Sequence, residues 1–171
     1  NMTYDQICHE HVTYYDLTMI KKVLNKANLQ INKVSFNEIN GGSFNLICSK
    51  KSSRLKIDKQ GINNILENEK IYYENKNLEG FALRISNNAK TLKELLENTL
   101  KSKKIIIGYG ASTRGNVILN YAGSDNKLIS KICDANPFKY DRKTPGSQIP
   151  IITKENMRKL KPDYLLVLIW S

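Results

Sequence analysis

The stretch Lys104–Asn116 constrains the fold of this chain more than any other part of the sequence. A run of three isoleucines ends in the Gly-x-Gly of Gly108 and Gly110, and an apolar helical pattern begins at Val117. A strand, a tight glycine turn and a helix in this order open a Rossmann-type βα unit. We therefore expect an α/β fold, a Rossmann-like parallel sheet with flanking helices.

The same stretch suits an anion. Gly108 and Gly110 allow a ligand close to the backbone, and the helix that follows offers unpaired N–H groups at its positive end. Ser112 and Arg114 add a hydroxyl and a guanidinium that match a phosphate or pyrophosphate. Gly115 comes two positions later than the third glycine of the dinucleotide fingerprint. The alternative is a purely structural turn, with Arg114 as a solvated charge.

Hydrophobic periodicity predicts the helices and strands around this unit. Apolar residues three or four positions apart predict three amphipathic helices, over 15–28, 62–73 and 78–100. Apolar, β-branched runs predict the strands, over 31–39, 44–49, 128–133, 148–152 and 164–170. The first two strands flank Asn40–Ser43, whose composition suits the turn of an antiparallel hairpin. The last run is continuously apolar and reads as a buried parallel strand.

Both histidines of the chain lie next to a carboxylate in the short segment Cys8-His9-Glu10-His11. A neighbouring acid can orient an imidazole that acts as a general base. A His-x-His metal chelate is the weaker interpretation, because no second Cys/His pair follows at structural spacing, and we predict no metal. A third interpretation is a polar loop that merely precedes a helix.

Composition narrows the classes of function. A chain of 171 residues with 40% hydrophobic and 25% charged residues can bury a core and is typical of a soluble globular protein. Its longest apolar run is too short to span a bilayer, and three widely spaced cysteines fit a reducing cytoplasm. The net charge of +11 attracts anions, but no basic segment alternates with aromatic residues, so we expect no nucleic-acid partner.

The motifs Tyr4–His11, Asn40–Ser43 and Gly108–Ala111 occur together in this one chain, and a closing pattern that includes Asp134 and Lys139 follows them. In combination they resemble the S-adenosylmethionine-dependent C-methyltransferases that act on nucleotide-linked keto-deoxysugars. The resemblance spans nearly the whole chain. Each motif alone is unspecific.

The resemblance implies three segments. Residues 1–50 resemble the tail of a catalytic methyltransferase domain, with an active-site segment, a helix and a β-hairpin; 51–103 form a helical connector; 104–171 form the Rossmann-like C-terminal domain, which helps to bind the nucleotide-sugar. S-adenosylmethionine is the implied cofactor, bound mainly by parts absent from this chain, so the fragment alone is expected to be inactive. A homo-oligomer is compatible with this hypothesis.

The chemistry of the family is removal of a proton from the carbon next to a sugar ketone, followed by attack of the enolate on the methyl group of the cofactor. By its motif, His11 resembles the general base and Glu10 a residue that assists it. Members of the family often have a tyrosine at the position of Cys8, and its hydroxyl could stabilise the enolate. The thiol of Cys8 is only a weak hydrogen-bond donor for this role. The residues expected to bind substrate lie in the glycine turn, in the next helix and after the next strand: Gly108, Gly110, Ala111, Ser112, Arg114, Asn116, Asp134 and Lys139.

The competing hypothesis is a non-catalytic Rossmann module that binds NAD or another nucleotide. It rests on the glycine turn and on Asp134, which follows a predicted strand where an acid often binds a ribose hydroxyl. Helix capping is an equally good use for Asp134. A two-stranded hairpin is marginal by itself, so we also expect the 31–49 hairpin to dock on the 62–100 helices or to pair with another copy of the chain.

Overall fold

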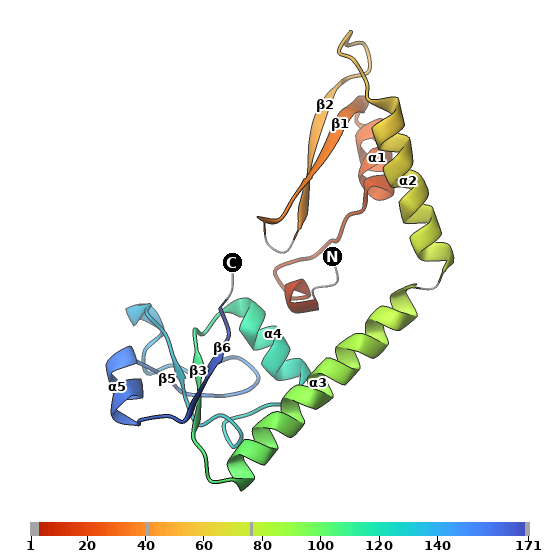
Figure 1. The fold of residues 1–171 in the computed structure, drawn as a ribbon. Helices are drawn as coiled ribbons and strands as arrows, with labels where there is room; N and C mark the ends of the chain where they lie inside the picture. Colours follow the sequence, from red (N-terminus) through yellow and green to blue (C-terminus); the bar gives the residue numbers. More distant parts are fainter. Residues whose placement is uncertain (1–3, 40–41, 76, 170–171) are drawn as a thin grey trace. The chain divides into compact units, whose positions relative to one another are not determined.

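The computed structural model describes residues 4–39, 42–75 and 77–169 (Figure 1). These residues form two compact units, one from the described part of 12–82 and one from the described parts of 3–11 and 83–170. Residues 4–11 therefore group with the Rossmann-like part of the chain, and helix α3 (Asn77–Lys101) is divided between the units. The assignment of function to three segments stays a prediction.

The first unit contains a hairpin and two helices: α1 (Leu17–Lys26), β1 (Leu29–Asn37), β2 (Ser43–Lys50) and α2 (Lys59–Glu74). The strands pair antiparallel, with Val34 opposite Leu46 and Phe36 opposite Phe44, as the sequence predicts. Asn40 and Gly41 of the predicted turn lie outside the described residues.

Two carboxylates define the start of α1. Asp16 accepts the N–H of Met19 at 2.6 Å, and Glu69 of α2 accepts the N–H groups of Leu17 and Thr18 at 2.7 and 3.0 Å. The first N–H groups of a helix lack intrahelical partners, so acids at this end stabilise it. Because Glu69 belongs to another helix, the same contacts fix α2 against α1.

The hairpin packs on these helices through one apolar face. Leu17, Ile31 and Ile62 form the buried centre, and Val34 and Leu46 pack against it. The expected docking of the hairpin on the first of the 62–100 helices is thus confirmed. Burial of side chains of this size contributes roughly 1.5–3 kcal/mol each, which is how a two-stranded hairpin becomes stable here.

We predict that the first unit loses stability between about pH 10 and pH 12. The Tyr73 hydroxyl donates to Asp16 at 2.8 Å, and this bond, helped by burial, raises the pKa of Tyr73 to about 12. Because the pKa is higher in the native than in the unfolded chain, the Tyr73–Asp16 bond stabilises the unit fully below the unfolded pKa near 10. This stabilisation is lost as the pH rises through the native pKa. Denaturant unfolding should show the decline in the native chain and in the Tyr72→Phe control. Persistence of the same decline in Tyr73→Phe would contradict the assignment.

The second unit contains a four-stranded sheet in which neighbouring strands are all parallel: β3 (Ile106–Tyr109), β4 (Ile132–Cys133), β5 (Ile151–Ile152) and β6 (Tyr164–Val167). The spatial order is β5-β4-β3-β6, which corresponds to the order 3-2-1-4 of the first four strands of a Rossmann fold, counted along the chain. Flanking elements are η1 (Tyr4–Gln6), α3, α4 (Thr113–Tyr121), η3 (Pro137–Lys139) and α5 (Lys154–Lys159). The predicted α/β fold class is confirmed.

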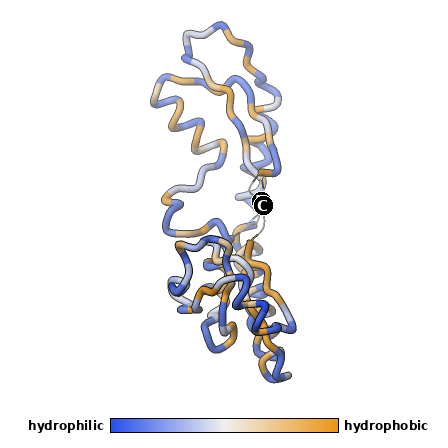
Figure 2. Tube along the Cα trace, turned by 90° about the vertical axis from the view of Figure 1, so that its left-hand side faces the viewer, coloured by the Kyte–Doolittle hydropathy of each residue, from blue (hydrophilic) through white to orange (hydrophobic). Residues whose placement is uncertain are grey.

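The core of this unit lies between the sheet and two helices. Leu96 of α3, Leu119 of α4 and Ile132 of β4 are almost completely buried and pack in one cluster. Figure 2 shows hydrophobic and hydrophilic residues alternating along the helical parts of the trace. This alternation is what helices with one buried face require.

Three strand predictions need correction. Only the last two residues of 128–133 are a strand, because the N–H groups of Leu128 and Ile129 donate to the Asp125 carbonyl and form a turn that buries Ile129. The 148–152 strand likewise shrinks to β5. The final strand is parallel as predicted, but it is not buried, since Tyr164 and Val167 are 56% and 57% exposed. The reason is topological: β6 lies at the edge of the sheet.

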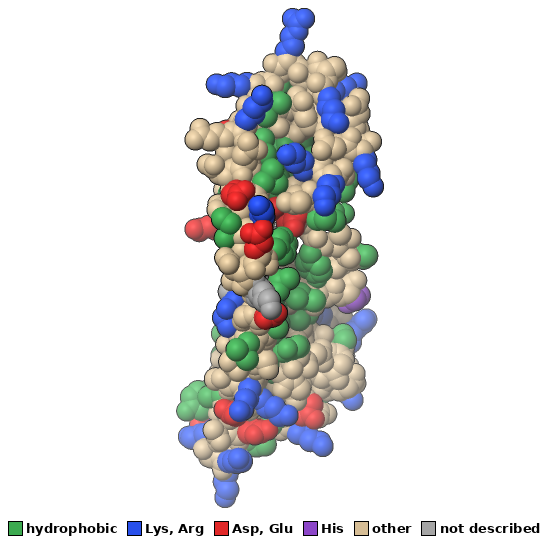
Figure 3. All heavy atoms as spheres, turned by 90° about the vertical axis from the view of Figure 1, so that its right-hand side faces the viewer, with side chains coloured by type: hydrophobic (Ala, Val, Ile, Leu, Met, Phe, Trp, Pro, Cys, Tyr) green, Lys and Arg blue, Asp and Glu red, His purple; other side chains and the backbone are tan. Residues whose placement is uncertain are grey.

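Basic residues outnumber acidic ones in this chain by 27 to 16. On the face shown in Figure 3, lysine and arginine side chains are scattered and do not gather into one patch. Within the described ranges, no helix has the length and apolar character needed to cross a membrane.

Candidate functional site

The glycine turn after β3 is packed against the protein itself. A Cβ on Gly108 would lie 2.6 Å from the Ile132 side chain, and one on Gly110, whose φ is +90°, would collide with Ile169. These two glycines therefore let the chain itself come close, where the sequence suggested a ligand. For them the structure fits the alternative of a structural turn.

Ser112 is engaged in the same way at the start of α4. Its hydroxyl oxygen accepts the N–H of Gly115 at 2.9 Å and caps the helix. The hydroxyl also donates to the carbonyl of Leu168 at 2.6 Å, just beyond β6. Ser112 thus holds the amino end of α4 against the strand that pairs with β3.

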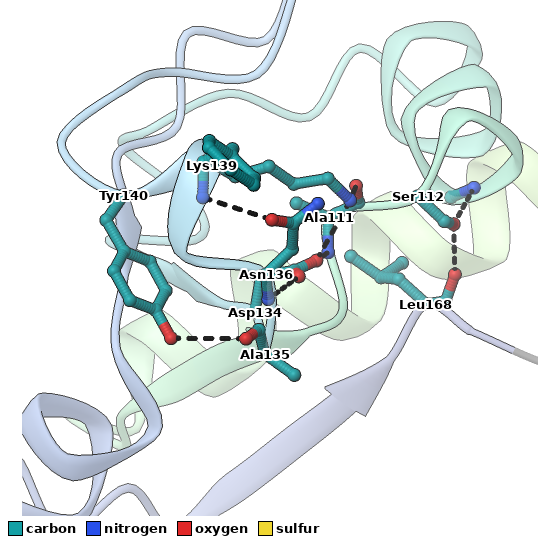
Figure 4. Close-up of polar contacts among 10 residues, drawn as sticks. Ala111, Ser112, Asp134, Ala135, Asn136, Lys139, Tyr140 and Leu168 are labelled. Carbon is teal, nitrogen blue, oxygen red and sulfur yellow. Dashed lines mark hydrogen bonds and ion pairs between the residues drawn. The ribbon is translucent and has the colours of Figure 1, made fainter.

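Asp134 joins two loops at the carboxyl ends of β3 and β4 (Figure 4). Its carboxylate accepts the N–H groups of Ala111 and Asn136, both at 2.7 Å, and the Lys139 ammonium lies 3.3 Å away. Lys139 also donates to the Ala111 carbonyl at 2.8 Å. Burial opposes ionisation of Asp134, but the two N–H groups and Lys139 outweigh it and hold the pKa of the carboxyl below its usual range.

The segment with the histidines forms a turn, so it is neither extended nor helical as considered from the sequence. The N–H of His11 donates to the Cys8 carbonyl at 3.1 Å, and the Nδ1 atom of His11 lies 2.6 Å from the Gln6 carbonyl oxygen. Glu10 Oε1 lies 4.0 Å from Nε2 of His9, and both of these side chains are exposed. The structure therefore gives Glu10 a contact with His9 and gives the His11 ring a backbone acceptor.

Arg114 anchors this segment to α4. Its Nε atom forms an ion pair with Asp5 in η1, and the Asp5 and Arg114 side chains are only 6% and 20% exposed. Next to this pair, the rings of Tyr4 and Tyr121 pack with centroids 5.5 Å apart. Arg114, expected from the sequence to meet a phosphate, thus has an internal carboxylate partner.

An open pocket of about 610 Å³ lies beside the glycine turn, the start of α4 and the loop before β5. From the first eleven residues it is lined by Ile7, Cys8, His9 and Glu10, and from α4 and the turn before it by Ala111, Ser112, Thr113, Asn116, Val117, Asn120 and Tyr121. The remaining lining residues are Lys139, Arg142, Lys143, Thr144, Pro145 and Ile151. Three cations therefore face one carboxylate, which favours an anionic ligand.

The pocket brings together six of the residues predicted from the sequence: Cys8, Glu10, Ala111, Ser112, Asn116 and Lys139. Five other predicted site residues are not among the described residues that line this pocket: His11, Gly108, Gly110, Arg114 and Asp134. The roles of all eleven in substrate binding or catalysis stay predictions.

Sequence reasoning missed Arg142 and Lys143, which supply two of the three cations. The signal was present as a stretch with three basic residues, Lys139 to Lys143, that begins six residues after the predicted 128–133 strand.

Cys8, Cys48 and Cys133 carry free thiols. No group of three or more histidine, cysteine, aspartate or glutamate side chains suited to a metal occurs among the described residues. Burial is the main cause that raises the pKa of the Cys133 thiol, which favours its unreactive protonated form.

The described residues define a Rossmann-like domain with a basic pocket beside its first βα turn, and comparison with known proteins specifies the family. The family model described as the C-methyltransferase C-terminal domain matches residues 38–171. The whole chain is also 27% identical over 179 residues to the C-methyltransferase NovU of Streptomyces niveus, and it covers 41% of that protein's length. The chain belongs to the C-methyltransferase C-terminal domain family. Its relationship is thus to methyltransferases.

Proposed function

We propose that this chain is part of an S-adenosylmethionine-dependent C-methyltransferase that acts on a nucleotide-linked keto-deoxysugar, and that the 610 Å³ pocket holds the nucleotide-sugar. The observation that carries the proposal is the meeting of two groups of residues in one pocket. Cys8, His9 and Glu10 contribute the active-site segment, and Lys139, Arg142 and Lys143 contribute charges that a diphosphate needs.

An orphaned acceptor supports a polar ligand in this pocket. The Oδ1 atom of Asn116 is buried, and no described residue donates a hydrogen bond to it. Buried polar atoms in folded proteins nearly always have a partner. A hydroxyl of a sugar or an N–H of a pyrimidine base would supply the missing donor.

Within this proposal His11 removes the proton from the carbon next to the sugar ketone, and the Gln6 carbonyl orients its ring. The electron pair of the broken C–H bond forms a C=C bond to the ketone carbon, and the π pair of the C=O bond moves to the oxygen, which gives the enolate. The basic residues of the pocket hold the diphosphate, so that the sugar end points toward the active-site segment.

On the side where a Cβ would lie, Gly108 packs against Ile132 and Gly110 against Ile169, which supports a cofactor site elsewhere. We propose that S-adenosylmethionine is held by other parts of a longer protein. The fragment by itself is then expected to bind the nucleotide-sugar without methylating it.

The fragment is expected to bind a pyrimidine nucleoside diphosphate and to be stabilised by it, because a ligand of the native state raises the melting temperature. Calorimetric titration with UDP and dTDP tests this. Replacing both Arg142 and Lys143 by alanine should weaken binding at least about tenfold, equivalent to about 1.4 kcal/mol. The double variant Lys127→Ala/Lys159→Ala removes the same charge outside the pocket and should bind like the native chain.

NAD in the same titration separates the competing hypothesis from ours. Stabilisation by NAD but not by UDP or dTDP would favour the NAD-binding module and contradict a nucleotide-sugar site. Absence of binding by all three ligands at millimolar concentration would contradict both.

A further inference from the structure

The ring of His11 is held by a backbone acceptor. Its Nδ1 atom lies 2.6 Å from the carbonyl oxygen of Gln6. A carbonyl oxygen has lone pairs and no hydrogen, so it can only accept. The contact therefore requires the proton on Nδ1, and in the neutral ring the basic lone pair then lies on Nε2.

This contact is exposed, so water competes with it unless the segment is held in place. The same Gln6 carbonyl accepts the N–H of Cys8 at 3.0 Å, and the N–H of Ile7 donates to Tyr4 at 2.9 Å. These bonds shape the turn, but they are all local and cannot fix it to the rest of the unit.

The Asp5–Arg114 ion pair supplies that attachment. Asp5 is adjacent to Gln6 in η1, and its side chain is 6% exposed, so the pair is shielded from water. Arg114 lies in the first turn of α4, where the helix dipole disfavours a cation. The ion pair with Asp5 offsets this cost. Arg114 can therefore serve a structural role at this position without binding a ligand.

We infer that Asp5 and Arg114 are positioning residues, which hold η1 on α4 so that the Gln6 carbonyl keeps His11 in its Nδ1–H form. The inference rests on the proposed function, in which His11 is the base. Nε2 is then the atom that takes the substrate proton. Neither Asp5 nor Arg114 needs to touch the substrate for this role.

Nitrogen-15 NMR of the whole chain tests the inference, because chemical shifts of the ring nitrogens distinguish the two neutral forms. The chain has two histidines, and His9→Gln leaves His11 as the single signal. At a pH where the ring is neutral, we expect His11 to be mainly the Nδ1–H form. A mixture like that of a free imidazole would overturn the inference without any further variant.

Variants of the pair then test its role. Arg114→Met and Asp5→Asn should shift His11 from the Nδ1–H form toward the free mixture, and Arg114→Lys should restore part of the native signal. Asp163→Asn is the matched control, because the Lys104–Asp163 pair, 2.8 Å apart, is an exposed ion pair of the same unit. Unchanged His11 signals in Arg114→Met or Asp5→Asn, with the fold verified by melting, would overturn the inference.

The readout does not depend on binding. Absence of the Nδ1–H form in a chain with native Asp5 and Arg114 that still binds UDP would overturn only this inference. Retention of that form in a chain that binds no nucleotide would contradict only the proposed function.

Discussion

Replacing Asp134 by alanine is expected to lower the free energy of unfolding of the second unit by roughly 2–4 kcal/mol, because hydrogen bonds to a charged group contribute roughly 1.5–3 kcal/mol each. Its carboxylate is the common acceptor for Ala111, Asn136 and Lys139. The variant removes this acceptor from two backbone N–H groups and from the Lys139 ammonium. Denaturant unfolding, followed by far-ultraviolet circular dichroism, measures the loss of stability.

The effect of Asp134 should depend on pH. Its native pKa lies below the usual value near 3.9, so its contribution is complete above that value and is lost as the pH falls through the native pKa. The native chain and Asp134→Ala should therefore differ most above pH 5 and converge below about pH 4. A difference that persists unchanged to lower pH would contradict this role of the carboxylate. Asp125→Ala, which removes an acid that caps a different turn, serves as the control.

Gly115→Ala is expected to destabilise the second unit by roughly 1–3 kcal/mol, although alanine normally stabilises a helix by about 1 kcal/mol relative to glycine. A Cβ at this position would lie 2.7 Å from Leu168 Cβ and 2.8 Å from the Leu168 carbonyl oxygen. Backbone cannot rotate away as a side-chain tip can. The N–H of Leu168 donates to the Tyr109 carbonyl at 2.9 Å, and the added methyl group would push Leu168 away from this acceptor.

The matched control is Gly80→Ala, another glycine inside a helix. There the methyl group should give the ordinary helix gain, so the two variants are expected to change stability in opposite directions. Chemical unfolding of both variants is the measurement. Equal stabilisation by both would show that α4 does not pack on Leu168 as closely as described.

Long elements could be predicted from the sequence because each carries its own signal. The stripes of α1, α2 and α3 repeat over several turns, and the hairpin strands are bounded by a turn composition. The two-residue strands β4 and β5 were not delimited, since a buried apolar residue such as Ile129 occurs in a turn as readily as in a strand. Burial of β6 depends on its place in the sheet, which periodicity does not encode.

The candidate site was predicted in part. The sequence pointed to the segment around Cys8–Glu10 and to the start of α4, and the structure places both at one pocket. The partner of Arg114 is Asp5, 109 positions away, and no local pattern encodes such a pairing. The sequence could not separate the two uses of the glycines, because their conformational freedom serves close packing and ligand approach equally; the contacts with Ile132 and Ile169 fit close packing.

In the proposed function the nucleotide end of the substrate occupies the pocket between Cys8–Glu10 and the basic stretch Lys139–Lys143. Amide NMR of the isotope-labelled chain during titration with UDP or dTDP tests it directly. We expect the largest shift changes at Cys8–Glu10, Ala111–Asn116 and Lys139–Thr144. Changes confined to Tyr109, Cys133 and Lys154, which line a separate pocket of about 230 Å³, or no changes at all, would contradict it.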